Sequence, residues 1–156
     1  MYDAHRDLVD ALAAMPDALD GLLNGVSEEQ ARAARGGDEG WSVIEVACHL
    51  RDAEEHSVRR VRAMIEADRP ILTGYDQEAL AIEHDYAHSP LAPACAEIAR
   101  LRAIHVDLLR ALSDAGWERE GMHDERGRVT IENYVIHIVG HDMQHLGQIA
   151  WALRDA

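Results

Sequence analysis

Four long stretches of this chain repeat their apolar residues at the three-to-four-residue spacing of an α-helix, and this pattern restricts the fold most. The stretches cover about residues 3–23, 42–69, 89–116 and 130–154. Each predicts a helix with one apolar face, and such a face is stable only when another element covers it. Four such helices predict an all-α fold, namely a four-helix bundle.

The composition agrees with helices rather than sheets. Alanine is abundant and phenylalanine is absent. Alanine loses no side-chain entropy in a helix, whereas strands favour aromatic and β-branched residues. Because 156 residues is the usual size of one domain, we expect residues 1–156 to form a single bundle.

Capping signals mark where several helices should begin. Ser42 is followed three residues later by Glu45, the spacing of a capping box, in which each side chain satisfies a free backbone N–H at the helix start. Ser27 and Gln30 repeat this spacing and predict a further short helix. Thr130 is a suitable N-cap for the last helix.

Proline and glycine predict several of the breaks. Pro16 should kink or split the first helix, because proline lacks a backbone N–H and clashes with the preceding turn. Ser89 should cap the third helix, with Pro90 at its first position and Gly116 at its end. Residues 121–127 are predicted to be a polar loop.

The connection between the second and third helices covers residues 69–89, with a short helix expected near residues 76–82. It is long enough to cross the whole bundle. We therefore expect the two helices that it joins to run parallel, which predicts an up-down-down-up order.

The net charge disfavours two classes of partner. Acidic residues number 29 and basic residues 15, which gives a net charge of −14. A protein that binds nucleic acid or an anionic membrane surface needs a basic face. No apolar run approaches the length that spans a bilayer. We therefore expect neither nucleic acid nor a membrane as a partner.

The cellular location is predicted from the start of the chain. Residues 1–7 lack the basic-then-apolar layout of a secretory signal, so we expect a cytoplasmic protein. Its two cysteines, Cys48 and Cys95, would then stay reduced. They are too few for a disulfide framework and are expected to be small buried hydrophobic residues.

His141 and His145 lie four residues apart in the last predicted helix. Residues at this spacing share one helix face, so two imidazoles there can bind one metal ion. On a helical wheel both face the apolar stripe, whereas His137 lies toward its rim. His49, within two turns of the start of the second helix, is the candidate third ligand. Three neutral imidazoles leave a position open on the metal, which is typical of a catalytic site.

The spacing alone leaves two interpretations open. Two histidines four residues apart are also typical of an ordinary core or surface pair. Position 142 is aspartate, so the sequence is not the H-E-x-x-H of the zinc proteases, whose glutamate is the general base. A third histidine on another helix favours a metal, because bundles build metal sites from side chains of facing helices.

Several motifs together carry a resemblance to a known family. They are G-W-S-V at residues 40–43, H-L-R-D-A-E at 49–54, Y-D at 75–76 and H-I-V-G-H-D-M-Q-H-L-G-Q-I at 137–149. Over about residues 8–153 the chain resembles the DinB/YfiT-like helical-bundle superfamily of metal-dependent proteins.

The resemblance implies an unusual four-helix bundle with a three-histidine metal site at His49, His141 and His145. It also implies homodimers. Characterised members include bacillithiol S-transferases and mycothiol-dependent enzymes, so the resemblance further implies chemistry with small thiols.

Two carboxylates, Glu54 and Asp142, project into the apolar stripes of their helices. A buried ionised carboxylate is costly unless it is paired. Each is predicted either to form a buried ion pair with an arginine such as Arg102, or to accept a hydrogen bond from a metal-binding imidazole and orient it. His105 is predicted to be an ordinary core histidine. The histidines predicted to lie at the surface are His5, His56, His84, His88 and His123.

Two functions are consistent with these features. The first is a metal-dependent enzyme that acts on small molecules, with Zn²⁺ or Ni²⁺ held by three histidines. The ion would activate a low-molecular-weight thiol for S-transfer or a water for hydrolysis, and the resemblance favours the thiol. The second is a non-catalytic, dimeric binding module with a structural metal or none. A two-fold homodimer is expected, since this is the commonest closed symmetry.

Overall fold

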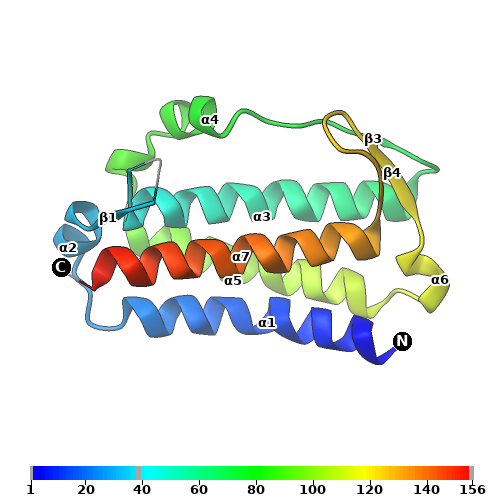
Figure 1. The fold of residues 1–156 in the computed structure, drawn as a ribbon, viewed down its shortest axis with the longest axis horizontal. Coiled ribbons are helices and arrows are strands. Elements are labelled where there is room, and N and C mark those ends of the chain that lie inside the picture. The colour runs from blue at the N-terminus through cyan, green and yellow to red at the C-terminus, as the bar shows by residue number, and fades with distance from the viewer. Residues whose placement is uncertain (1, 38–39, 155–156) are drawn as a thin grey trace.

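The computed structural model of this protein describes residues 2–37 and 40–154 and contains four long helices packed side by side (Figure 1). They are α1 (Asp3–Leu23), α3 (Val43–Glu66), α5 (Leu91–Arg110) and α7 (Ile131–Leu153). The predicted all-α four-helix bundle is confirmed. Within the described residues, no helix combines the length and the apolar character needed to span a bilayer.

The long connection between α3 and α5 determines the topology. α1 and α7 run in one direction along the bundle, and α3 and α5 run in the other (Figure 1). The chain returns beside α3 through β3 (Ile71–Leu72), α4 (Gln77–Glu83) and the 3-10 turn η1 (Tyr86–His88). This return lets two consecutive helices run parallel, and the predicted up-down-down-up order is confirmed.

Side-chain caps fix where α3 and α7 begin. The hydroxyl of Ser42 accepts a hydrogen bond from the backbone N–H of Glu45 at 3.3 Å, and the Glu45 carboxylate accepts one from the Ser42 N–H at 2.8 Å. The hydroxyl of Thr130 accepts one from the backbone N–H of Asn133 at 3.1 Å. The short helix α2 (Glu28–Ala33) begins with the other predicted capping box. These predicted helix starts are confirmed.

Of the two outcomes predicted for Pro16, a kink or a split, the split of α1 is absent from the structure. α1 is a single helix with Pro16 inside it. Leu12, Met15 and Leu19 are buried on both sides of the proline, so one continuous apolar face packs against the bundle. Burial of that face outweighs the local cost of the proline.

α5 differs from its prediction at both ends. Pro90 is its N-cap, because the hydroxyl of Ser89 donates to two carbonyls of the preceding turn instead. The helix ends six residues before Gly116. The chain then turns into α6 (Asp114–Trp117), which buries the indole of Trp117.

Short strands occupy several of the connections between helices, including part of the predicted loop at residues 121–127. β4 (Glu120–His123) and β5 (Gly127–Thr130) form an antiparallel hairpin, and β3 pairs parallel with β4. β1 (Arg35–Gly36) pairs antiparallel with β2 (Trp41–Ser42) just before α3. Strands of two to four residues are too short to show an alternating pattern in a sequence.

The buried apolar residues form two clusters, one toward each end of the bundle. The first joins the start of α3 to the end of α7, and the second joins the end of α3 to the start of α7. Buried polar side chains project inward between α3, α5 and α7, from the second turn of α3 onward. These polar residues are His49, Asp52, Glu54, Ser57, Arg102, His105, Asp142 and His145.

Candidate metal centre

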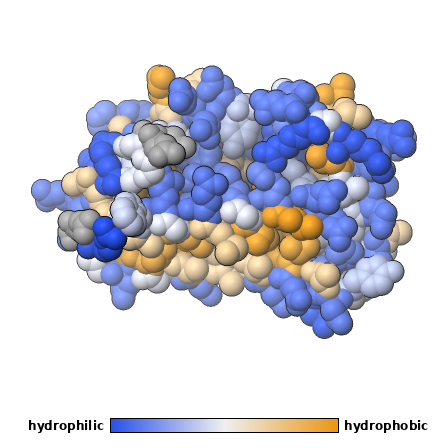
Figure 2. All heavy atoms as spheres, in the orientation of Figure 1, coloured by the Kyte–Doolittle hydropathy of each residue, from blue (hydrophilic) through white to orange (hydrophobic). Residues whose placement is uncertain are grey.

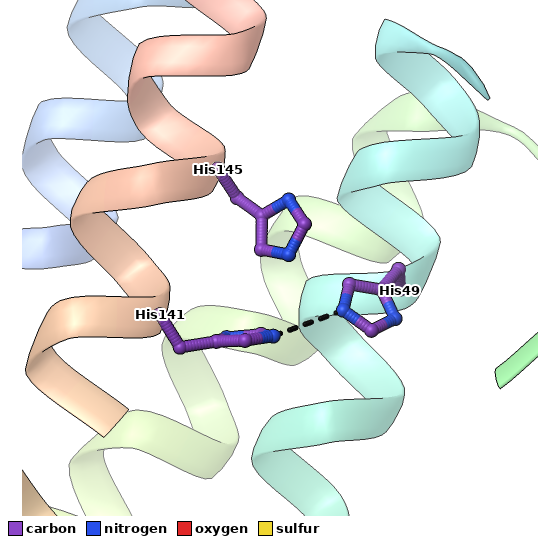
Figure 3. Close-up of side chains that lie close together, drawn as sticks. All are labelled: His49, His141 and His145. Carbon is purple, nitrogen blue, oxygen red and sulfur yellow. Dashed lines mark hydrogen bonds between the residues drawn. The ribbon is translucent and has the colours of Figure 1, made fainter. Parts of the chain in front are cut away.

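Three histidine side chains meet between α3 and α7, and we call them the imidazole cluster (Figure 3). His49 projects from α3, whereas His141 and His145 project from successive turns of α7. Each offers a ring nitrogen, and these nitrogens lie within 4.8 Å of one another. The Nε2 atoms of His49 and His141 are 3.0 Å apart. The ring of His145 lies 4.7 Å from that of His49 and 4.5 Å from that of His141, between centroids.

Burial keeps two of these imidazoles neutral. Loss of hydration, followed by the nearby charge of His145, lowers the pKa of His49 to about 4 and that of His141 to about 3. The carboxylate of Asp52 acts in the opposite direction on His49 but does not prevail. At neutral pH both rings therefore offer lone pairs, which is the state that a metal ligand needs.

The third imidazole is oriented by Gln148, one turn further along α7. Nδ1 of His145 lies 2.8 Å from the amide oxygen of Gln148. The amide nitrogen of Gln148 donates in turn to the carbonyl of Gly36 in β1, at 2.8 Å. This second bond points the amide oxygen toward His145, so Nδ1 is the donor and Nε2 is the ring nitrogen that remains for a metal. Gln148 was not among the predicted site residues, although its spacing of three residues after His145 places both on one helix face.

Gly36 allows β1 to approach α7 this closely. A Cβ atom at Gly36 would lie 3.1 Å from the Cβ atom of Ala152 and 3.2 Å from the carbonyl oxygen of Gln148. A side chain there would push β1 away from α7. Trp41, which pairs with Gly36 across the two strands, lies 5.2 Å from the ring of His49 between centroids. The β1–β2 pair thus covers one side of the imidazole cluster.

A cleft of about 230 Å³, which we call the histidine cleft, opens beside the imidazole cluster. His49 and His141 line it, together with residues of the β4–β5 hairpin and of the connection between α3 and α5. The cluster is therefore largely buried and still accessible to a small molecule, as binding sites commonly are. Further polar and aromatic lining residues are Ser57, Arg60, Tyr75, His123, Arg126, Tyr134 and His137.

The donor set of the imidazole cluster fits a divalent transition metal, since neutral imidazole suits Zn²⁺ and Ni²⁺. A second group in the described residues, His123 with Asp124 and Glu125, also brings possible ligands together. Its two carboxylates are exposed, and Asp124 already accepts the backbone N–H of Gly74 at 2.7 Å. The imidazole cluster is therefore the better metal site.

One known protein family matches the sequence of this chain over nearly the whole bundle. Residues 11–149 match the DinB superfamily. This chain belongs to the DinB superfamily. The resemblance inferred from the histidine and G-W-S motifs is thereby confirmed.

Relatives of this DinB-superfamily protein carry names that mention a metal. The chain is 30% identical over 110 residues to a protein of Oceanobacillus iheyensis, and 30% identical over 116 residues to YfiT of Bacillus subtilis. Both relatives are named "Putative metal-dependent hydrolase". The alignments cover 70% and 72% of this chain but only 63% and 64% of the relatives, so the chain spans less than two thirds of their length.

A solved structure of YfiT from Bacillus subtilis shares the fold of this DinB-superfamily protein. The two superpose with a TM-score of 0.91 over 99% of this chain and 89% of the other, at 23% identity. That structure is described as having an unusual four-helix bundle topology. The likeness establishes that both chains have the same fold.

Glu54 and Asp142 belong to a different buried group, which we call the ion cluster and which also contains Arg102 and His105. Arg102 lies 2.9 Å from the carboxylate of Glu54 and donates to that of Asp142 at 2.6 Å. His105 donates from Nδ1 to Glu54 at 2.9 Å. Of the two interpretations of these carboxylates, the structure shows the ion pair with Arg102. Within the described residues, their polar contacts are with the ion cluster and not with the imidazole cluster.

The ion cluster is closed to solvent and joins all four long helices. Its side chains are between 0% and 7% exposed. Although burial opposes ionisation, the hydrogen bond and charge of His105 and the charge of Arg102 lower the pKa of Glu54. Arg102 also donates to the carbonyl of Leu12 in α1, at 3.2 Å.

The prediction of surface positions was wrong for two histidines of this DinB-superfamily protein. His5 stacks on the indole of α6, with ring centroids 4.2 Å apart, and is buried. His123 is buried in β4. The elements that cover them assemble only through tertiary contacts. His84 and His88 are exposed as predicted, and His56 is half-buried.

The cysteines lie outside the imidazole cluster. Cys48 is fully buried and Cys95 is partly buried. Burial raises the pKa of both thiols, that of Cys95 to about 11. Both therefore stay protonated at neutral pH, as expected of small packing residues.

Proposed function

We propose that this protein is a metal-dependent enzyme that acts on small molecules, with a divalent ion held by His49, His141 and His145. The observation that carries the proposal is the meeting of three imidazoles from two helices beside an accessible cleft. The names of the relatives support both a metal and hydrolysis. Zn²⁺ and Ni²⁺ are the ions that we expect, because both favour imidazole ligands.

The surrounding residues prepare the site for such an ion. Burial keeps His49 and His141 unprotonated, so little proton release accompanies binding. Gln148 accepts a hydrogen bond from Nδ1 of His145 and so leaves its Nε2 for the metal. Three protein ligands leave a position open, where a bound ion would lower the pKa of water or a thiol and so supply a nucleophile at neutral pH. The histidine cleft admits the substrate to that position.

Hydrolysis is the reaction to test first. The experiment is metal analysis of untagged protein, followed by assays on model esters and amides. His145→Ala is compared with His56→Ala, which changes a histidine of α3 outside the imidazole cluster. We expect bound metal and metal-dependent hydrolysis in the wild type and in His56→Ala, and neither in His145→Ala. Equal metal content in all three proteins would overturn the proposed site.

S-transfer from a small thiol is the second candidate, because the family resemblance implies it and the same ligands suit a bound thiolate. This route also presupposes the cytoplasmic location predicted from the sequence. The same preparations are assayed with a low-molecular-weight thiol and a model electrophile. Product that requires the thiol assigns transfer, and ester cleavage without it assigns hydrolysis. A protein with neither activity and no metal would instead be a non-catalytic binding module.

We also infer a homodimer formed through the outer face of α7. Ile136, Met143 and Trp151 are large apolar side chains on α7 that are 50%, 69% and 60% exposed. Figure 2 shows apolar atoms gathered in a band along this helix. Two-fold pairing would cover such a face on both copies at once. Light scattering should give the dimer mass, and Met143→Glu should shift it toward the monomer. A monomer mass for the wild type at micromolar concentration would refute the dimer.

A further inference from the structure

The histidine cleft is basic, although the whole chain has a net charge of −14. Arg60 from α3 and Arg126 from the turn between β4 and β5 both line it. Among the described residues of its lining, Glu125 is the one carboxylate. An acidic protein that gathers two arginines around one cleft has a local preference there for anions.

Arg60 is held in place by neutral partners. Its guanidinium donates to the carbonyl of Thr73 at 2.5 Å and to the hydroxyl of Tyr134 at 3.2 Å. It also lies 5.7 Å from the ring centroid of Tyr75 and 5.9 Å from that of Tyr134. The preceding residue, Arg59, instead pairs with a glutamate. The hydrogen bonds of Arg60 thus go to neutral groups, while its charge also acts on the exposed carboxylate of Asp124. Three of its five N–H donors remain for a ligand.

The charges of the two arginines also affect the pKa of a histidine inside the histidine cleft. His137 lies between Tyr134 and His141 on α7, with ring centroids 6.5 Å and 6.2 Å away. Burial lowers the pKa of His137 first, and the charges of Arg126, His123 and Arg60 lower it further. Each of these charge effects comes from a basic side chain. The influence of the two arginines therefore reaches His137, the neighbour of His141 in the histidine cleft.

The spacing along α7 gives the length of a matching ligand. Tyr134, which contacts Arg60, precedes His141 by seven positions, or about 10 Å along the helix axis. A small molecule of about this length can place one end at the arginines and the other at the imidazole cluster. Guanidinium groups bind carboxylate and phosphate through paired N–H donors.

We propose that the histidine cleft binds its substrate through an anionic group, a carboxylate or a phosphate, held by Arg60 and Arg126 while the reacting bond lies at the imidazole cluster. The placement of the reacting bond rests on the proposed function. The anion site itself does not, because its arginines belong to the protein whether or not a metal is bound.

The test is calorimetric titration of the full chain with succinate, with inorganic phosphate and with the neutral succinamide. Each titration is made on metal-loaded and on chelated protein. Arg60→Gln and Arg126→Gln are compared with matched controls next to them. The controls are Arg59→Gln, which changes the arginine paired with Glu55, and Arg128→Gln, which changes the arginine paired with Glu120.

We expect succinate or phosphate to bind chelated wild type, with succinamide at least tenfold weaker. Arg60→Gln and Arg126→Gln should each weaken anion binding about tenfold, at unchanged metal content, and the controls should match the wild type. The tighter of the two anions identifies the group. Anion binding seen only in metal-loaded protein, or weakened equally by the controls, would overturn the anion site. If the protein binds the anion but takes up no metal, the anion site is supported and the proposed metal-dependent function is refuted. Since Arg126 is exposed, its variant tests the site even if Arg60→Gln fails to fold.

Discussion

The imidazole cluster and the ion cluster both interrupt the apolar interior of the same bundle, yet they differ in what balances them. In the ion cluster, Arg102 faces two carboxylates and the group is sealed from solvent. In the imidazole cluster, three rings of one kind face each other beside a cleft. The first is balanced by charges of the chain itself, whereas in the second the described residues bring ring nitrogens together beside a cleft.

The difference teaches how two buried polar groups can be told apart. A buried charge with protein partners of opposite sign stabilises one arrangement of the helices, and removing one partner is costly. Ring nitrogens that converge beside a cleft are the feature on which the proposed metal site rests. Four predictions test this contrast, from the largest expected effect to the smallest.

Removing the cation of the ion cluster should have the largest effect on stability. Arg102→Met leaves the buried carboxylate of Asp142 without its cation and that of Glu54 with His105 alone, so we expect a loss of about 3–5 kcal/mol in the free energy of unfolding. Denaturant unfolding measures it. Arg100→Met, two residues away and exposed, is the control and should leave stability nearly unchanged. Equal losses in both variants would show that the ion cluster does not act as a balanced unit.

Removing one ring of the imidazole cluster should affect metal binding and not the fold. His141→Ala should weaken metal binding at least about 100-fold, because a ligand atom is lost. Its helical circular dichroism should match that of the wild type, since the apolar clusters at the two ends of the bundle are intact. Metal titration and circular dichroism are measured on the same samples. Unfolding of this variant, or of chelated wild type, would indicate a structural metal.

Removing the side chain that orients His145 should have a smaller effect of the same kind. Gln148→Ala should weaken metal binding about 10–100-fold, the usual cost of losing a hydrogen bond to a ligating imidazole. Gln144→Ala, on an exposed turn of α7, is the control. Metal titration of the two variants is the measurement. An unchanged affinity in Gln148→Ala would remove Gln148 from the site.

Acidification of the chelated protein should have the smallest effect, a loss of folding stability. The folded-state pKa of His49 is about 4, below its ordinary value of 6.5, so the unfolded chain binds more protons between these values. Stability is then lost as the pH falls from 6.5 toward 4. At pH 5.5 the loss from His49 is about 1.4 kcal/mol. Denaturant unfolding of wild type and His49→Ala at pH 7.5 and 5.5 measures it, and an equal drop in both would contradict the lowered pKa.

Much of the fold could be predicted because its signals are local. The capping boxes at Ser27 and Ser42 and the cap at Thr130 each concern residues within one turn, and all of them form. The failures involve residues whose surroundings come from distant parts of the chain. Pro16 sits in an unbroken helix because its neighbours are buried, and His5 is buried because α6 packs on it.

The sequence by itself determined four helices, their order and the faces that they present, since 3.6 residues per turn is a property of the backbone. It also determined that His141 and His145 share a face of one helix. Only the tertiary structure decided that His49 reaches them, that Gly36 fixes Gln148, and that Arg102 pairs with both buried carboxylates. Each of these contacts joins residues at least 40 positions apart or on different elements. Such contacts depend on how whole helices pack, which no local pattern encodes.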